Sequence, residues 1–434
     1  MTIDRRYFLI NGIVGTACFA GPAARAQSGK TGGRKIVLGQ SVPLTGAADQ
    51  IGLAYLNGAK MYFDSINQKN GVSGVKIEVR TLDDSYSATK AAANATTFVN
   101  EGVDALFGFV GTASCDAAYA ATIAQAPLFF APFGASDALR APDIASVFNV
   151  RPGLADEAYK IVRHCATLGQ DRIAVFAEDD AMGRGGLAAV AQALIDLKLP
   201  PLVGSALSPV NSDKVDAAVA ALMKVQPQAI IQVSLFNSSA AFIRKTRAAG
   251  YGGQFLNFSV VGIDPLFSAL GKEIGGVVMS QVVPSPRSVG MPLIKEYLGL
   301  LDQTDHIASY ESIEGYIAAR AFSEGVRRSV ADTGKVDRGG LKKAFESMSD
   351  YNMGGFRVNL KAKKYESVRV IDLVTITPDG KVLRWQHRHQ RVGRCRDNQK
   401  NRIGLMDRHL EFLNGPTCAL DASRPPAPCA APGQ

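Results

Sequence analysis

A repeated alternation of short apolar runs with longer amphipathic stretches constrains the fold of this chain more than any other feature of its sequence. From Lys35 onward, runs rich in Val, Ile and Phe alternate with stretches of roughly ten to twenty residues in which apolar residues recur at helical spacing. This order is typical of βαβ units, so it predicts an α/β fold with mainly parallel sheets. The chain has 434 residues, 47% of them hydrophobic and 20% charged, which is enough for two domains with cores of their own.

The expected strands and helices fall into two consecutive series. The first runs from a strand at residues 36–42 to a strand at residues 127–132 and predicts one doubly wound lobe. The second opens with a strand at residues 147–151 and continues to a strand at residues 255–258, which predicts a second lobe of the same kind. Long helices follow beyond residue 277, and two strands close the pattern before residue 386. We therefore expect the chain to cross between the lobes more than once.

Residues 1–26 have the features of an export signal. Arg5 and Arg6 precede an uncharged run at residues 7–22, and Ala24 and Ala26 supply the small residues expected before a cleavage site. The paired arginines are compatible with twin-arginine export as well as with general secretion, and both routes stay open. The apolar run is shorter than the roughly 20 residues needed to span a bilayer, so no membrane span is expected here or later in the chain. The sequence therefore predicts a periplasmic protein.

The last 48 residues differ from the rest of the chain. Residues 387–434 show no periodicity and hold three of the five histidines and three of the six cysteines. We interpret them as a disordered tail and hypothesise that they are aberrant, arising from a frameshift or fusion; a basic arm that binds nucleic acid is the alternative. The net charge of +9 includes +4 from this tail and +2 from residues 1–26. The remaining +3 is too small to indicate a nucleic-acid partner.

The sequence contains none of the common catalytic motifs. We find no Gly-x-Ser-x-Gly elbow, no Walker loop and no His-Glu-x-x-His, and only His164 and His306 fall in the body of the chain. Cys115 and Cys165 form no Cys-x-x-Cys pair, so we expect free buried thiols and no metal site or cofactor. The chain is therefore not expected to be an enzyme.

One glycine-rich turn is compatible with nucleotide binding. Residues 183–188 read Gly-x-Gly-x-x-Ala after an expected strand and at the start of an expected helix, as in a dinucleotide-binding turn. Glu178, Asp179 and Asp180 would repel an approaching pyrophosphate, and the next strand does not end in an acid that could hold a ribose. We favour an ordinary tight turn and keep a nucleotide-dependent enzyme as an alternative.

Three loops of the first lobe carry small polar residues where parallel strands end. They are residues 41–46, 108–114 and 132–136, and each supplies glycine or a small hydroxyl residue just before a helix. Open α/β sheets bind ligands at this edge, where free backbone N–H groups and hydroxyls can converge on a polar or anionic group. N-capping by Thr112 or Ser114 is the alternative for any single residue. Several such loops on one edge favour a pocket.

The same stretches resemble the type I periplasmic binding proteins of ABC transporters, the branched-chain amino-acid binding family. The likeness covers residues 35–385 and depends on the order and spacing of several short pieces. These are residues 38–46 (LGQSVPLTG), 57–59 (NGA), 82–84 (LDD), 148–151 (FNVR), 176–183 (FAEDDAMG) and 315–316 (GY).

The resemblance implies an architecture of two Rossmann-like lobes joined by a three-segment hinge. The crossings would lie near Arg151, Val282 and Met353. Lobe I would then comprise residues 34–150 and 283–352, and lobe II residues 151–282 and 353–386. The ligand would be held in the cleft between the lobes without reaction, and the permease subunits of an ABC transporter would be the partner of a monomeric protein. A sensor that uses the same clamp to control another protein is an alternative.

The resemblance also assigns ligand contacts. Loops around Thr112 and Phe133 would hold a carboxylate, although Ala135 stands where a threonine is expected. In lobe II, Ser259 replaces an acid that would bind an ammonium group, and Gln232 replaces an aromatic residue. The candidate ligand-binding residues are Ser41, Gly111, Thr112, Ala113, Phe133, Gly134, Ala135, Asp180, Gln232, Ser234 and Ser259.

These replacements predict the class of solute. Without an acid at Ser259, a buried ammonium group would stay unpaired at a cost of several kcal/mol. We therefore expect a small organic carboxylate without an amino group, for example an aromatic acid, or an amide, in preference to an amino acid.

Overall fold

The computed structural model describes residues 34–46, 48–360 and 371–385. Within them the chain forms a five-stranded sheet, a seven-stranded sheet and a two-stranded hairpin. The expected export signal and the expected disordered tail lie outside the described residues. The α/β fold with mainly parallel sheets is confirmed.

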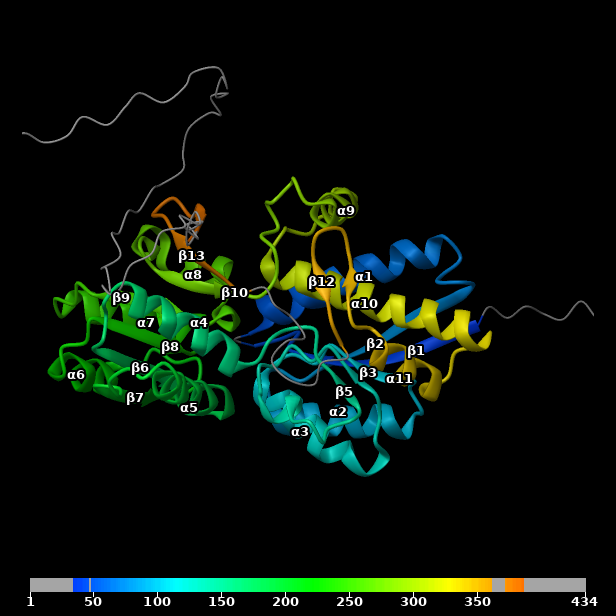
Figure 1. The fold of residues 1–434 in the computed structure, drawn as a ribbon, viewed down its shortest axis with the longest axis horizontal. Coiled ribbons are helices and arrows are strands. Elements are labelled where there is room, and N and C mark those ends of the chain that lie inside the picture. Colours follow the sequence, from blue (N-terminus) through cyan, green and yellow to red (C-terminus); the bar gives the residue numbers. More distant parts are fainter. Residues whose placement is uncertain (1–33, 47, 361–370, 386–434) are drawn as a thin grey trace, which may run out of the picture. The chain divides into compact units, whose positions relative to one another are not determined.

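The first lobe is built on a parallel sheet with the order β2-β1-β3-β4-β5. Its strands are β1 (Arg34–Val42), β2 (Val75–Asp83), β3 (Ala105–Phe107), β4 (Phe129–Phe130) and β5 (Val147–Phe148). Helices α1 (Asp49–Gln68), α10 (Tyr310–Thr333) and α11 (Arg338–Glu346) cover one face, while α2 (Ala88–Asn100) and α3 (Thr112–Thr122) cover the other (Figure 1).

Side chains alternate between the two faces of β1. Ile36 and Leu38 are buried in the core beneath α1 and α10, whereas Gly39 faces α2. A Cβ atom at Gly39 would lie 2.4 Å from the ring of Phe98, so the close packing of α2 on this strand requires glycine. Successive side chains of β1 therefore point to opposite faces of the sheet, and helices cover both of these faces.

The second lobe has a mixed sheet with the order β14-β13-β10-β9-β8-β6-β7. The parallel strands are β6 (Ile173–Glu178), β7 (Gly204–Ser208), β8 (Ala229–Val233), β9 (Gln254–Asn257) and β10 (Val278–Gln281), and the antiparallel strands are β13 (Asp372–Ile376) and β14 (Val382–Arg384). One face packs against α4 (Leu154–Thr167) and α5 (Ala181–Asp196), and the other against α6 (Asp216–Lys224), α7 (Phe236–Ala248) and α8 (Ile263–Leu270). Every residue of β6 and β8 is buried, since helices cover both faces.

One expected strand belongs to the other sheet. Residues 147–151 were expected to open the second series, but β5 is shorter and pairs in parallel with β4 of the first sheet. An apolar run signals a buried strand without indicating which sheet it joins, so the prediction was wrong in this respect. The chain then passes directly from β5 into α4 of the second lobe.

The return of the chain to the second lobe differs from the expected crossing near Met353. Strands β11 (Tyr351–Asn352) and β12 (Arg357–Val358) form a hairpin whose contacts lie with the first lobe. The amide of Leu293, in α9 (Pro292–Leu301), donates to the carbonyl of Gly354, and Leu360 donates to Met348 just after α11. Residues up to Leu360 therefore keep contacts with first-lobe elements.

Two further observations concern the described residues as a whole. None of their helices is long and apolar enough to cross a membrane, and they include no group of three or more His, Cys, Asp or Glu residues arranged to hold a metal ion. Cys115 and Cys165 are buried and free, as expected.

Candidate functional site

The start of α3 presents hydrogen-bond donors at the carboxyl edge of the first sheet. Gly111 precedes the helix with a φ of 107°, and a Cβ atom there would lie 2.9 Å from the ring of Tyr86, so this turn requires glycine. Thr112 and Ala113 follow as the first helical residues, whose N–H groups have no acceptor within the helix. The hydroxyl of Thr112 accepts a hydrogen bond from the amide of Ala135 at 3.3 Å, so it can still donate one.

The loop after β4 is tied to this helix start. The amide of Phe133 donates to the carbonyl of Phe109 at 2.7 Å, and Gly111 donates to the carbonyl of Phe133 at 3.0 Å. A Cβ atom at Gly134 would come within 2.9 Å of the sulfur of Cys115. The structure therefore brings together the residues expected at 111–113 and 133–135.

Ser41, by contrast, takes part in a buried network within the first lobe. Its hydroxyl donates to Asp84 at 2.7 Å and accepts from the amide of Asn94 at 3.0 Å. Burial raises the pKa of Asp84 to about 6, although the bond from Ser41 opposes the shift. The hydrogen of this hydroxyl and one of its two lone pairs are therefore used within the protein.

In the second lobe, Asp180 caps α5. Its carboxylate accepts from the amide of Gly183 at 2.7 Å, and a Cβ atom at Gly183 would lie 1.9 Å from the carbonyl oxygen of Glu178. The glycine-rich turn is therefore a tight strand-to-helix connection whose helix start is already occupied by a carboxylate. A phosphate at this position would meet a negative charge.

Glu178 is a buried acid at the end of β6. Its Oε1 atom accepts from the hydroxyl of Ser238 and from the amide of Asn211, both at 2.7 Å. Burial nevertheless raises its pKa to about 7. Hydrogen bonds from Ser238 and from the backbone amides of Asn211 and Leu235 oppose this shift. Glu178 was not among the residues expected to bind ligand.

Gln232 and Ser234 lie inside the second lobe. Gln232 is fully buried and donates to Asn257 at 3.1 Å, and Ser234 shares a 2.6 Å hydrogen bond with Ser239 of α7. Ser239 also lies 3.5 Å from the side-chain oxygen of Asn257. These polar groups bind one another between the sheet and α7, where their contacts fix the interior of the lobe.

Arg151 connects the two lobes at the first crossing. Its side chain is almost completely buried, and its Nη2 atom donates to the hydroxyl of Ser259, in the short helix η3 (Ser259–Val261), at 2.6 Å. On the first-lobe side, Nη1 lies 3.3 Å from Glu314 of α10, and the guanidinium carbon lies 4.5 Å from the centre of the Phe133 ring. Phe133 and Ser259, expected as ligand contacts in different lobes, therefore touch the same side chain.

Glu157 of α4 accepts four hydrogen bonds around this guanidinium. Its Oε1 atom accepts from the hydroxyl of Ser259 at 3.0 Å and from Arg151 at 3.4 Å. Its Oε2 atom accepts from the amide of Ser259 at 2.8 Å and from the hydroxyl of Ser280 at 2.5 Å. The roles of Arg151 and Glu157 were not predicted from the sequence, where the one signal was a charged residue at an expected crossing, directly before Pro152.

Two further buried acids of α10 lie near this site. Burial raises the pKa of Glu311 and of Glu314 to about 7, and Arg151 opposes both shifts. On the other side of the site, burial and then the charges of Asp180 and Glu178 raise the pKa of Tyr86, a first-lobe residue. The acids of the second lobe therefore lie close to the donor edge of the first.

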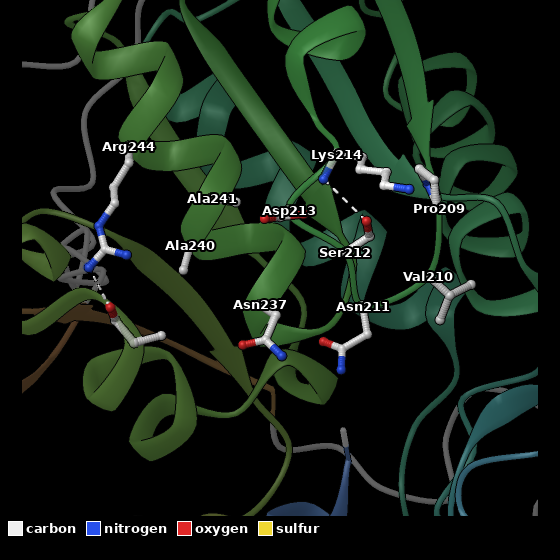
Figure 2. Close-up of a pocket in the computed structure, with 11 residues that line it drawn as sticks. Pro209, Val210, Asn211, Ser212, Asp213, Lys214, Asn237, Ala240, Ala241 and Arg244 are labelled. Carbon is white, nitrogen blue, oxygen red and sulfur yellow. Dashed lines mark hydrogen bonds between the residues drawn. The ribbon is translucent and has the colours of Figure 1, made fainter. Parts of the chain in front are cut away.

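A separate pocket lies on the second lobe. It has a volume of about 640 Å³ and is formed by the loop after β7 together with α7 (Figure 2). Arg244 bends toward the carbonyl of Ala269 and pairs with Glu273 at 2.6 Å. None of the residues expected to bind ligand lines this pocket. Its lining residues are Pro209, Val210, Asn211, Ser212, Asp213, Lys214, Asn237, Ala240, Ala241, Arg244 and Ala269.

The chain is similar to known proteins over nearly all of its described length. The family model described as periplasmic binding protein matches residues 35–381. No curated protein sequence matches the chain at a significant level. Among solved structures, a possible leucine/isoleucine/valine-binding protein from Rhodopirellula baltica is 27% identical, with a TM-score of 0.75 over 81% of this chain and 96% of that one.

Two further structures extend this comparison. A substrate-binding periplasmic protein from Ralstonia solanacearum is 26% identical, with a TM-score of 0.75 over 81% of this chain and all of that one. A fatty acid ABC transporter substrate-binding protein from Thermomonospora curvata shares the fold at 19% identity, with a TM-score of 0.72 over 81% of this chain and 92% of that one. The two-lobed fold and the extent of the match show that the chain belongs to the periplasmic binding protein family, with the type I fold.

Proposed function

We propose that this protein is a periplasmic solute-binding protein that delivers a small organic solute to the permease subunits of an ABC transporter. Members of its family bind small ligands and are not enzymes. The observation that carries the proposal is the contact of Arg151 with Ser259 and Glu314, which joins the two lobes beside the donor groups of Thr112 and Ala113.

Closure of the lobes would couple solute binding to delivery. A solute that touches the loops of both lobes binds the closed form more tightly than the open form, and this difference in affinity shifts the population toward closure. The permease would then recognise the closed form. No bond of the solute is made or broken in this cycle.

The donor groups of the first lobe favour a solute with a carboxylate. A helix start with a free hydroxyl hydrogen on Thr112 suits an anion, because N–H groups and the helix dipole both favour negative charge. On the second-lobe side, Ser259 supplies a hydroxyl and an amide, but both bind Glu157. We therefore favour a carboxylate without an amino group, or an amide. The solved relatives are named for branched-chain amino acids and for fatty acids, and both of these classes carry a carboxylate.

Mass spectrometry of small molecules released from natively purified protein tests this proposal. We expect one organic acid or amide at about one molecule per chain, and a Thr112→Val variant that retains much less of it than Thr112→Ser. Tight calorimetric binding of leucine or valine, together with no binding of simple organic acids, would contradict the assigned solute class.

A further inference from the structure

We propose that the pocket beside α7 is a second binding site, separate from the site of the transported solute, and that it binds a small neutral polyhydroxy compound such as a sugar (Figure 2). This inference goes beyond the proposed function and does not depend on it. The pocket has a volume of about 640 Å³, within the range of roughly 300–1,000 Å³ that is usual for small-molecule sites. It lies within the second lobe and is formed by the loop at residues 209–214, by α7 and by Ala269.

The loop at residues 209–214 forms one wall, and the interior of the lobe holds it in place. The amide of Asn211 donates to the carboxylate of Glu178 at 2.7 Å, and the amide of Ser212 donates to the hydroxyl of Ser238 at 2.8 Å. Glu178 and Ser238 are both fully buried. The wall is therefore anchored from behind, so a ligand would bind without first ordering the loop.

Arg244 forms another wall, across the pocket from Val210 in the view of Figure 2. Its Nε atom pairs with Glu273 at 2.6 Å, and its Nη2 atom donates to the carbonyl of Ala269. These two bonds occupy the Nε–Nη2 edge of the guanidinium, and paired N–H groups of this kind are what an arginine uses to bind a carboxylate or phosphate. The side chain is therefore fixed within the protein, and its charge is matched by Glu273.

The other charges of the pocket are balanced as well. Lys214 directly follows Asp213 in the chain, and both residues are exposed and line the pocket. The two positive charges of Lys214 and Arg244 are therefore matched by the two negative charges of Asp213 and Glu273. A binding site of this composition favours a neutral ligand over an ion, because charge complementarity determines which ligands a polar surface selects.

Two asparagine side chains supply polar contacts. Asn211 comes from the loop, and Asn237 comes from the first turn of α7, where it is exposed. Figure 2 shows their amide groups at the same end of the pocket. A side-chain amide both donates and accepts hydrogen bonds, as does every hydroxyl group of a sugar. The two amides can therefore bind neighbouring hydroxyls of one ligand.

Small side chains of α7 lie between these polar walls. Ala240 and Ala241 follow Asn237 by three and four residues, so the three lie on one face of the helix. Ala240 is buried, and both alanines line the pocket. Their methyl groups leave room for a ring and offer apolar contact to its C–H groups, in the mixture of apolar and polar groups that small-molecule sites have.

Saturation-transfer difference NMR tests the site, because it detects weak ligands of a large protein. The neutral probes are glucose, maltose and myo-inositol, and glucuronate is the charged probe, since it keeps the ring of glucose and adds a carboxylate. We expect saturable binding of glucose in the millimolar range and weaker binding of glucuronate. Tighter binding of glucuronate than of glucose, or no saturable signal from any neutral probe, would overturn the proposal.

Substitutions then locate the bound sugar. For Asn237→Ala we expect the dissociation constant of glucose to rise by roughly threefold to tenfold, as the loss of one hydrogen bond predicts. Asn100→Ala, at the exposed end of α2, is the matched control and should bind glucose as the wild type does. Asn211→Gly is the second variant, because glycine keeps the left-handed backbone of this residue, with a φ of 46°, and it should weaken binding to a similar extent.

The solute site provides the final comparison. Thr112→Val, in the first lobe, should bind glucose as tightly as the wild type, with the fold of each variant checked by circular dichroism. Weaker glucose binding in Thr112→Val would place the sugar in the solute site and contradict a second site. Unchanged glucose binding in both Asn237→Ala and Asn211→Gly would contradict it too. No transported solute enters these measurements, so their failure is distinguishable from failure of the proposed function.

Discussion

The Nη2 atom of Arg151 lies 2.6 Å from the hydroxyl oxygen of Ser259, a residue 108 positions further along the chain. Arg151 stands where the chain leaves the first sheet, and Ser259 follows a strand of the second. The bond therefore connects the crossing itself to a loop that is expected to face the solute. A change of angle between the lobes would alter the contacts on the first-lobe side of Arg151, where it binds Glu314.

Replacing Ser280 with alanine should destabilise the protein. The hydroxyl of Ser280 donates to Glu157 at 2.5 Å, and its loss leaves a buried carboxylate with three donors. We expect a loss of about 1–3 kcal/mol in the free energy of unfolding, measured by urea denaturation. Ser205→Ala, at an exposed position of β7, is the control and should change the free energy by less than about 0.5 kcal/mol. Equal effects of the two substitutions would contradict the role of Ser280.

Glycine at position 58 should be essential for the packing of α1 against α10. A Cβ atom there would lie 1.8 Å from the carbonyl oxygen of Ser312, which is backbone and cannot move aside cheaply. Gly58→Ala should therefore cost at least about 2 kcal/mol in thermal or urea unfolding. Gly299→Ala is the matched control on α9, where a Cβ atom meets nothing within 4 Å, and should stabilise by about 0.5–1 kcal/mol. A neutral Gly58→Ala variant would show that the two helices are not this close.

The stability of the protein should fall as the pH rises from about 4.5 to about 7. Burial raises the pKa of Glu178, Glu311 and Glu314 from 4.5 to about 7, so in this window the folded protein holds protons that the unfolded chain has lost. Folding then takes up protons, and stability declines with pH until these groups are ionised in both states, above about pH 7.

Glu314→Gln tests this dependence. Removing one of the three groups should flatten the curve of unfolding free energy against pH between 5 and 7 by at most about 1.4 kcal/mol per pH unit. Glu346→Gln, at an exposed position of α11, should leave the slope unchanged. A slope in Glu314→Gln as steep as that of the wild type would contradict the assignment of a raised pKa to Glu314.

The fold was predictable from the sequence because the alternation of apolar runs and amphipathic stretches reflects burial on both faces of a sheet. The pairing of Thr112 with the loop at Ala135 was also accessible, since both follow strands of one parallel sheet. The sequence did not show which residues of neighbouring strands lie opposite one another. Gln232 was expected to contact ligand, but it lies opposite Asn257 in the sheet and its amide binds that residue in the interior.

The buried charges could not be predicted in the same way. The apolar pattern gives no sign that Arg151 pairs with Glu157 and Glu314. The three side chains meet only when both lobes and the crossings between them are folded. A hydrophobicity pattern predicts which apolar residues are buried. A charged side chain, in contrast, is buried only where a partner of opposite charge is present, and the pattern does not show that partner. The most informative group of the site was therefore visible only in the structure.

The central claim is that the donor edge at Thr112 and the Arg151 contact belong to one solute-binding site. Calorimetric titration of solute-free protein with the solute recovered from it tests this claim most directly, with the wild type, Thr112→Val and Arg151→Ala compared under one set of conditions. We predict binding at one solute per chain for the wild type and at least tenfold weaker binding for each variant. Wild-type affinity in both variants, with their folds intact by circular dichroism, would contradict the account.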